Sequence, residues 1–347
     1  MYCKRQNQVS TGISLGCRVT NIIRGTYQFM VVRARHTERI SIASSFDFSV
    51  TDRERWHAKE GQTLLPYCLD PLRRRSLYVA GADLEAAAAA PFYYLHLRRT
   101  AKAVVSVPWE QGRLVAGGSA SPILVFSPGR VGSTLLSAIL FEAGIPNVSE
   151  PDFFTQMTRA FAAGPLNPLR AAMQGAALNL GRDLASAFGQ GAPVVAKLRA
   201  ECCRAPWLIL ETGRPKTIFM TRRFEAWARS TRRVFRAGPK RAVAKYLQSL
   251  RALDWLQRNT QCHLLLYDSL LADLGGECAA LGAFLGCGIA ADAAARALAR
   301  DSQEGTPLEL GARPEQADAD EVVAETLKLW GSDKLVRIRA SLPLFDA

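Results

Sequence analysis

Residues 121–144, SPILVFSPGRVGSTLLSAILFEAG, contain the pattern that decides the fold of this 347-residue chain. The apolar run at residues 123–126 predicts a short buried strand, and Ser127-Pro128-Gly129 predicts a loop after it. Apolar residues at helical spacing from Ser133 predict a helix that stops at Gly144. Such a strand, glycine-containing loop and helix can bind phosphate, because loop amides and the positive helix N-terminus face the anion.

The loop also carries side chains that suit an anion. Arg130 supplies a cation, and Ser133 and Thr134 supply hydroxyl donors in the first helical turn. An ordinary turn with a helix-capping serine is the alternative, but a cation, a glycine and two hydroxyls coincide here within five residues. The loop departs from the Walker pattern GxxxxGK[ST], because Gly132 is followed directly by Ser133 without a lysine. This departure argues against an ordinary NTPase or kinase.

A second candidate anion site follows in the next part of the chain. Residues 216–221 predict another buried strand, and Arg222 stands at its end. The helix predicted from Phe224 has one apolar face and carries Ser230, eight residues after Arg222. An arginine and a serine are therefore expected together where this strand meets its helix.

These two patterns together resemble those of sulfotransferases that use 3′-phosphoadenosine-5′-phosphosulfate (PAPS). The residues similar to the family's 5′-phosphosulfate loop are Pro128, Arg130, Gly132, Ser133, Thr134 and Leu135. Gly129 is an extra residue, and Val131 replaces the usual serine. Arg222 and Ser230 match the family's 3′-phosphate motif in type, spacing and predicted context. The resemblance covers about residues 121–310.

The resemblance implies roles for these residues. Those expected to bind PAPS are Arg130, Gly132, Ser133, Thr134, Arg222 and Ser230. Glu150 stands before a proline, as a glutamate often does in bacterial and carbohydrate-type members, and would be the base for the acceptor hydroxyl. Asp152 is the second choice, and Glu150-Pro151 could instead cap the helix that begins near Asp152. Lys197 would act with Arg130 to neutralise the leaving phosphate. The alternative is that Lys197 only extends its ammonium group from the strand end into solvent.

Other features separate the chain from the steroid- and phenol-type members of the family. Those enzymes use a histidine base, and none of the four histidines stands at a matching place. Their Arg-Lys-Gly segment is also absent. Residues 301–306 resemble a Ser-Gln-x-Gly-Thr loop of some bacterial members, which would lie over the nucleotide. The resemblance therefore favours the bacterial or carbohydrate type.

The alternation of buried strands and helices predicts an α/β domain over residues 121–347. The resemblance implies three layers, a mainly parallel sheet with helices on both faces, as in the P-loop-like sulfotransferase fold. Residues 61–120 predict an N-terminal α+β segment and linker, with a strand at residues 92–97. Residues 1–60 are expected to be an extension with little order, in which residues 53–57 form a solvated bend.

The charge of the chain is unevenly distributed. The net charge is +13, and residues 199–241 hold 12 Arg/Lys against 3 Asp/Glu. Clustered cations suit an anionic ligand, although a solvated basic face is the commoner meaning of such a run. The eight cysteines lack a metal-ligand spacing, which favours a reduced, cytoplasmic chain with no metal site. There is no signal-peptide core and no run of about 18 apolar residues, so we expect no membrane span.

The expected activity is sulfuryl transfer from PAPS to a hydroxyl or amine of a small-molecule, carbohydrate or lipid acceptor. No nucleic-acid partner is expected, and the acceptor and the oligomeric state are left open. One alternative is a P-loop small-molecule kinase, which should need magnesium and an acidic Walker B strand end. Another is a non-catalytic nucleotide- or polyanion-binding protein, whose binding should depend steeply on salt.

Overall fold

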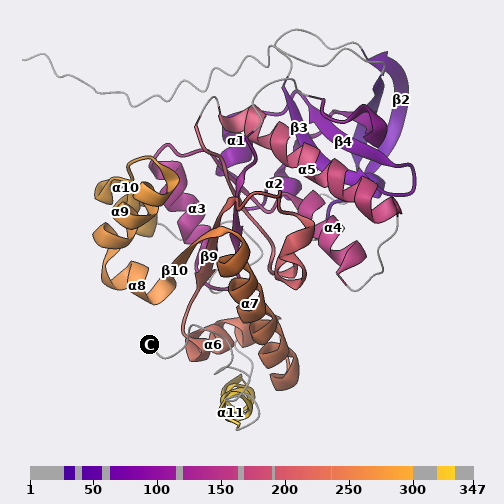
Figure 1. The fold of residues 1–347 in the computed structure, drawn as a ribbon. Coiled ribbons are helices and arrows are strands. Elements are labelled where there is room, and N and C mark those ends of the chain that lie inside the picture. Colours follow the sequence, from indigo (N-terminus) through magenta and orange to yellow (C-terminus); the bar gives the residue numbers. More distant parts are fainter. Residues whose placement is uncertain are drawn as a thin grey trace, which may run out of the picture.

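The computed structural model describes residues 27–35, 41–56, 63–114, 120–162, 168–189, 192–235, 237–299 and 319–332. Within these ranges the chain forms two five-stranded sheets, one parallel and one antiparallel, with helices packed around them (Figure 1). The parallel sheet carries the candidate site. The α/β class with a parallel sheet is therefore confirmed, whereas the antiparallel sheet was not predicted.

All strands of the parallel sheet run in one direction, in the order β10-β9-β6-β8-β7. The strands in that order are Gln261–Leu266, Lys216–Thr221, Ile123–Phe126, Val195–Lys197 and Asn147–Ser149. The apolar run at residues 123–126 is thus the central strand, β6. Because it lies between β9 and β8, the loop after it is flanked by the ends of both neighbours.

Helices cover both faces of this sheet. Ile123 and Val125 belong to one buried cluster and Leu124 and Phe126 to another, because alternate residues of a strand point to opposite faces. The helices that contribute to the first cluster include α3 (Ser133–Glu142), α6 (Phe224–Phe235), α9 (Leu274–Leu285) and α10 (Ala291–Leu298). Those of the second are α4 (Asp152–Phe161) and α5 (Pro168–Gly189), while α7 (Pro239–Asn259) contributes to both clusters.

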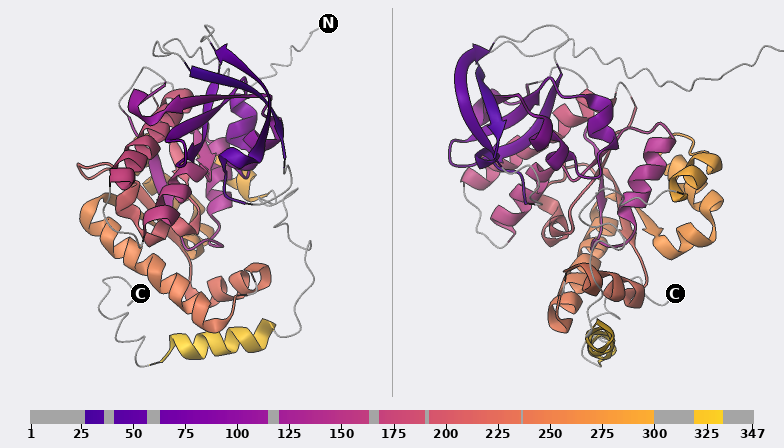
Figure 2. Two further views of the ribbon diagram at one scale, coloured as in Figure 1. Left: turned by 90° about the vertical axis from the view of Figure 1, so that its right-hand side faces the viewer. Right: turned by 180° about the vertical axis from the view of Figure 1, so that it is seen from behind.

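The antiparallel sheet has the order β2-β1-β5-β4-β3. Its strands in chain order are Tyr27–Ala34, Phe48–Trp56, Leu64–Asp70, Arg75–Ala80 and Ala103–Pro108. It lies against α5 at one end of the molecule, and α11 (Ala319–Trp330) lies at the other end (Figure 2). The division of the chain at residues 60 and 120 stays a prediction, but this sheet joins strands from both sides of residue 60.

The remaining described helices are short. They are α1 (Leu84–Ala89), α2 (Tyr93–Thr100), α8 (Tyr267–Ala272) and the 3-10 helices η1 to η4 at Ser45–Asp47, Trp109–Gln111, Ala200–Arg204 and Pro206–Leu208. In the part of the chain that the structure describes, no helix combines the length and apolar composition needed to cross a bilayer.

Two local predictions in the N-terminal part are wrong. Residues 93–97 belong to helix α2, with Phe92 as its N-cap, instead of a strand, because Tyr93, Tyr94 and Leu97 bury one helical face in the core. Residues 53–56 belong to strand β2 instead of a bend, because they pair with β1. His57, the last residue of the expected bend, lies outside the described residues.

Candidate functional site

The carboxyl ends of β6, β8, β7 and β9 open into one cleft of about 1100 Å³. Every site residue expected from the sequence lines it, namely Arg130, Gly132, Ser133, Thr134, Glu150, Lys197, Arg222 and Ser230. The two anion motifs and the acidic residue between them in sequence therefore meet in one place. Their roles remain predictions, while their position in a shared cleft is a property of the fold.

The loop after β6 is held in an unusual backbone conformation. Gly129, Arg130 and Gly132 have φ angles of +76°, +60° and +83°, in the left-handed region that L-residues other than glycine seldom adopt. Trp227 on α6 donates its indole N–H to the Gly129 carbonyl at 2.7 Å. A non-glycine residue in this region marks a constrained site, so the loop is fixed in shape by its surroundings.

A direct contact joins the two anion motifs. The Nε of Arg130 donates to the Oγ of Ser230 at 3.3 Å, across 100 residues of sequence. Ser230 lies on α6, whose first residue follows the end of β9 by three positions. The predicted 5′-phosphosulfate loop and the predicted 3′-phosphate motif are therefore parts of the same wall.

Arg222 follows β9 and faces the ring of Tyr267, with 4.7 Å from its guanidinium carbon to the ring centroid. Its carbonyl accepts a hydrogen bond from the Tyr246 hydroxyl at 2.7 Å, which fixes the backbone. The buried Nε of Arg222 has no hydrogen-bond partner among the described residues. A buried donor without an acceptor is costly, so this position favours an anionic ligand.

Gly132 lies directly under Tyr267. A Cβ at this position would overlap the aromatic ring, and φ is positive, so two separate constraints favour glycine. Tyr267 begins α8 and lines the cleft. No local sequence pattern around Tyr267 indicates that it packs on the loop after β6.

Glu150 lies between two cations at the end of β7. Its Oε1 is 3.4 Å from the Nζ of Lys197, and its Oε2 is 3.4 Å from the Nε of Arg199. Its backbone N–H donates to the Lys197 carbonyl at 2.6 Å, and its own φ is +61°. The side chain is only partly buried, so the carboxylate is held in a defined position and still reaches the cleft.

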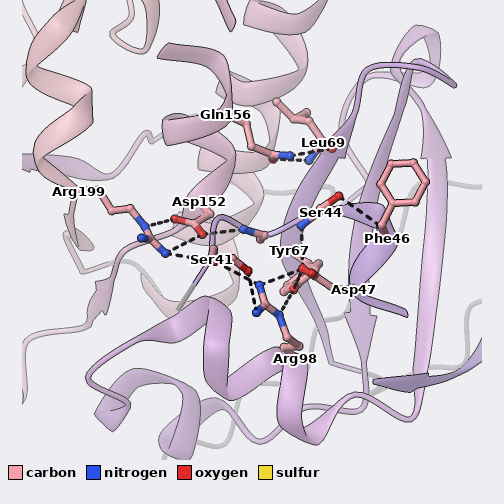
Figure 3. A network of polar contacts seen from close by, with 11 residues as sticks. Ser41, Ser44, Phe46, Asp47, Tyr67, Leu69, Arg98, Asp152, Gln156 and Arg199 are labelled. Atoms are coloured by element: carbon pink, nitrogen blue, oxygen red, sulfur yellow. Dashed lines mark hydrogen bonds and ion pairs between the residues drawn. The ribbon is translucent and has the colours of Figure 1, made fainter. Parts of the chain in front are cut away.

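Asp152, the second choice for the base, lies behind Glu150. It is fully buried and accepts two hydrogen bonds from Arg199, at 2.6 and 3.1 Å, and one from the Ala43 N–H at 2.8 Å (Figure 3). Burial raises the pKa of Asp152 to about 6, against the lowering effect of Arg199. Asp152 does not belong to the described lining of the cleft. Its position suits a group that orients Arg199.

A buried polar network connects Asp152 and Arg199 to the N-terminal residues 41–47 (Figure 3). The Ser41 carbonyl accepts hydrogen bonds from Arg98 at 3.2 Å and from Arg199 at 3.5 Å. Arg98 also pairs with the buried Asp47 at 3.0 Å, and Asp47 accepts from the Tyr67 hydroxyl. Residues 41–47 thus support Arg199, which contacts Glu150. Sequence reasoning missed Arg199 as a site residue, because these partners are far away in the chain.

The cleft is strongly cationic. Among the residues that the structure describes, its lining contains ten Lys/Arg side chains and two carboxylates, Glu150 and Glu201. The cations beyond the predicted ones are Arg159, Arg199, Arg204, Arg233, Arg241, Lys245 and Arg251. The basic run at residues 199–241 indicated most of them as a group. The described residues hold no cluster of three or more His, Cys, Asp or Glu suited to a metal, and residues 301–306 lie outside the described ranges.

No protein-family model matches the sequence, and no curated protein matches it. The structure is similar to the sulfotransferase domain of the Synechococcus PCC 7002 olefin synthase, with 13% identity and a TM-score of 0.37 over 63% of this chain and 98% of that domain. It is also similar to mouse sulfotransferase SULT7A1 complexed with PAP, with 10% identity and a TM-score of 0.33 over 64% and 89% of the two chains. Both are sulfotransferases, as the motif resemblance predicts. At these scores neither structure supports a statement about activity, so a functional conclusion has to rest on the residues of the cleft.

Proposed function

We propose that this chain transfers a sulfuryl group from PAPS to a hydroxyl of an acceptor molecule. The observation that carries this proposal is the contact between Arg130 and Ser230 in a cleft that also contains Glu150. Two separate anion sites joined in one wall suit a nucleotide with phosphate groups at two positions. A carboxylate beside them suits the removal of a proton from the acceptor.

The residues of the cleft fit such a nucleotide. The Nε of Arg222, which has no hydrogen-bond partner among the described residues, offers a donor for a 3′-phosphate, and the hydroxyl of Ser230 lines the same cleft. The N-terminus of α3, with Ser133 and Thr134 in its first turn, offers amide and hydroxyl donors for the 5′-phosphosulfate. Bound PAPS would supply a sulfuryl group on a phosphate leaving group.

Three side chains would act on the reacting groups. Glu150 would accept the proton of the acceptor hydroxyl, a role that is usually worth about 10²- to 10⁴-fold in rate. Lys197 and Arg130 would neutralise the charge that grows on the leaving phosphate. The ion pairs of Glu150 with Lys197 and Arg199 hold the base in place before the acceptor arrives.

The acceptor is proposed to be a small-molecule, carbohydrate or lipid hydroxyl or amine. Because side-chain cations surround the anion sites, we expect the activity to persist in excess EDTA. The cytoplasmic location and the lack of a nucleic-acid partner stay predictions from the sequence.

The proposal is tested by measuring the affinity of the chain for 3′,5′-adenosine bisphosphate, AMP and ATP-magnesium in parallel calorimetric titrations. We expect the bisphosphate to bind at least about tenfold more tightly than AMP, which corresponds to about 1.4 kcal/mol. Arg222→Gln should remove this preference and leave AMP binding almost unchanged. A preference for ATP-magnesium would indicate the kinase alternative instead, and equal binding of bisphosphate and AMP would contradict the 3′-phosphate site.

A further inference from the structure

The cleft extends beyond the proposed nucleotide residues to a wall formed by α7. Arg241, Ala244, Lys245, Gln248 and Arg251 line it at helical spacing, so one face of α7 looks into the cleft. Ten residues separate the first and last of these positions, or about 15 Å along the helix axis. We call Arg241, Lys245 and Arg251 the α7 cations.

The α7 cations lack the ion-pair partners that three exposed arginines on α6, α7 and α10 have. None of the three forms an ion pair with a described residue. Arg258, also on α7 but outside the cleft, pairs with Asp254 at 2.8 Å. Arg229 on α6 and Arg296 on α10 likewise pair with the acidic residue four positions earlier. The cleft face of α7 therefore carries three cations without an ion pair among the described residues, and of these Lys245 is acted on electrostatically by Glu201 of the same cleft.

The surroundings of Lys245 also favour an anion. Its Nζ lies 5.1 Å from the ring centroid of Phe235, and burial lowers its pKa. An anionic ligand would offset this loss of hydration. The net charge of the cleft also agrees with an anionic acceptor. Ten cations and two carboxylates give the described lining eight net positive charges, and PAPS would bring only about four negative charges.

We propose that the α7 cations bind an oxyanion group of the acceptor, so that the acceptor is itself an anionic hydroxyl compound, such as a uronate oligosaccharide or a phosphorylated sugar. The α7 wall and the Glu150 carboxylate line the same cleft, so one molecule can present its anionic group to α7 and its hydroxyl to Glu150. The reaction assigned to this acceptor rests on the proposed function, whereas anion binding by α7 does not.

The test uses the full chain saturated with 3′,5′-adenosine bisphosphate, which occupies the nucleotide residues. Trigalacturonate is titrated beside its methyl ester, and glucose 6-phosphate beside glucose, so that charge is the main difference within each pair. We expect at least one charged probe to bind about tenfold or more tightly than its neutral partner. The pair that shows the difference tells whether carboxylate or phosphate is the preferred oxyanion.

The variant R241Q/R251Q should lose at least about tenfold in affinity for the charged probe and stay within threefold of wild type for the bisphosphate. Lys245 is kept in this variant, because its Nζ lies close to Gly129 in the loop after β6. R258Q is the matched control, because Arg258 lies on the same helix outside the cleft. If the double variant does not fold, R251Q alone, at an exposed position, should show a smaller loss in the same direction.

Three results would overturn the inference. They are equal binding of charged and neutral probes, a charged-probe affinity that the α7 variants leave unchanged, and an equal loss of bisphosphate affinity in the α7 variants. The last result would assign the α7 cations to the nucleotide. Failure of the wild type to bind the bisphosphate would instead refute the proposed function, and the charged probes would still decide the role of α7.

Discussion

Two residues of the cleft have backbone conformations that are unfavourable for their residue types. Arg130 and Glu150 both have φ angles near +60°, which costs an L-residue of this kind about 1 kcal/mol or more. Each is fixed from outside, Arg130 by its contact with Ser230 and Glu150 by the Lys197 carbonyl. The surrounding fold thus places one cation and one carboxylate where local preference alone would not.

Replacing Glu150 by glutamine tests the role of this carboxylate. E150Q keeps the size of the side chain but cannot accept a proton, so we expect the transfer rate to fall by about 10²- to 10⁴-fold. Affinity for 3′,5′-adenosine bisphosphate should not fall, because the cleft becomes more positive. The measurements are sulfate transfer from labelled PAPS and calorimetric binding.

The matched control for that experiment is E211Q. Glu211 is a partly buried carboxylate paired with Arg182 at 2.7 Å, and it does not line the cleft. Its loss should leave the rate unchanged. Full turnover in E150Q together with a loss of turnover in D152N would assign the base to Asp152.

Replacing Gly132 by alanine tests the close packing of Tyr267. Both G132A and the control G81A place a Cβ at a positive φ, which should cost each about 1–2 kcal/mol of stability. Only at Gly132 does the Cβ meet the Tyr267 ring, whereas the space around Gly81 is open. We therefore expect roughly tenfold weaker bisphosphate binding in G132A and none of this loss in G81A. Equal affinities of the two variants would show that Tyr267 does not shape the nucleotide site.

The helices and strands differ in how well they can be predicted from their local sequence. Strand β6 and helix α3 could be predicted because an apolar run, a loop signal and helical spacing follow one another within 24 residues. The strand predicted at residues 92–97 was wrong, because Tyr93, Tyr94 and Leu97 suit a strand as well as a helix by local preference. Only packing against the core selects the helix.

The candidate site shows the same difference between local and distant information. The roles expected for Arg130 and Arg222 each came from a local motif, and the structure places both in the cleft. Arg199 has no such motif, because its importance comes from Asp152, 47 residues earlier, and from Ser41, 158 residues earlier. The antiparallel sheet was missed for this reason too, since β1 pairs with β5 and neither strand predicts the other.

The stability of the folded chain should depend on pH through Asp152, the first residue of α4. Burial raises its pKa from 3.8 to about 6, so between these values the folded chain binds a proton that the unfolded chain does not. The free energy of unfolding should therefore rise as pH falls from about 6 to about 4, by up to about 3 kcal/mol at 1.4 kcal/mol per pKa unit. Urea unfolding at several pH values, compared between wild type and D152N, measures this contribution.

The variant D152N cannot titrate at this position, so the difference in unfolding free energy, wild type minus variant, should increase toward pH 4. A decrease over the same range would mean that the ion pair with Arg199 outweighs burial and holds the pKa of Asp152 below its ordinary value.

One of the two buried clusters joins the antiparallel sheet to the parallel sheet. Leu65 of the antiparallel sheet and Phe219 of the parallel sheet belong to the same cluster, with α4 and α5 between them. A shared core of this kind should make the two sheets unfold together. The N-terminal sheet is then part of the support of the cleft, through the network around Ser41 and Arg199.

Core truncations in the two sheets test this coupling. L65A and F219A each remove a fully buried side chain and should cost about 2–5 kcal/mol. We expect both to shift the same single urea transition, followed by circular dichroism and by tryptophan fluorescence. L72A is the control, because Leu72 is 79% exposed. Two separate transitions, each moved by only one of the variants, would show that the sheets unfold independently.

The contact between Arg130 and Ser230 also determines when the cleft can form during protein synthesis. Its partners are 100 residues apart, and Tyr267, which covers Gly132, comes later still. A chain emerging from the ribosome completes the phosphate loop early but has no cleft until the residues through α8 are free. Contacts of such long range form slowly. The proposed ability to bind a nucleotide should therefore be acquired late in synthesis, and a chain stopped before Tyr267 should carry the loop without the complete cleft.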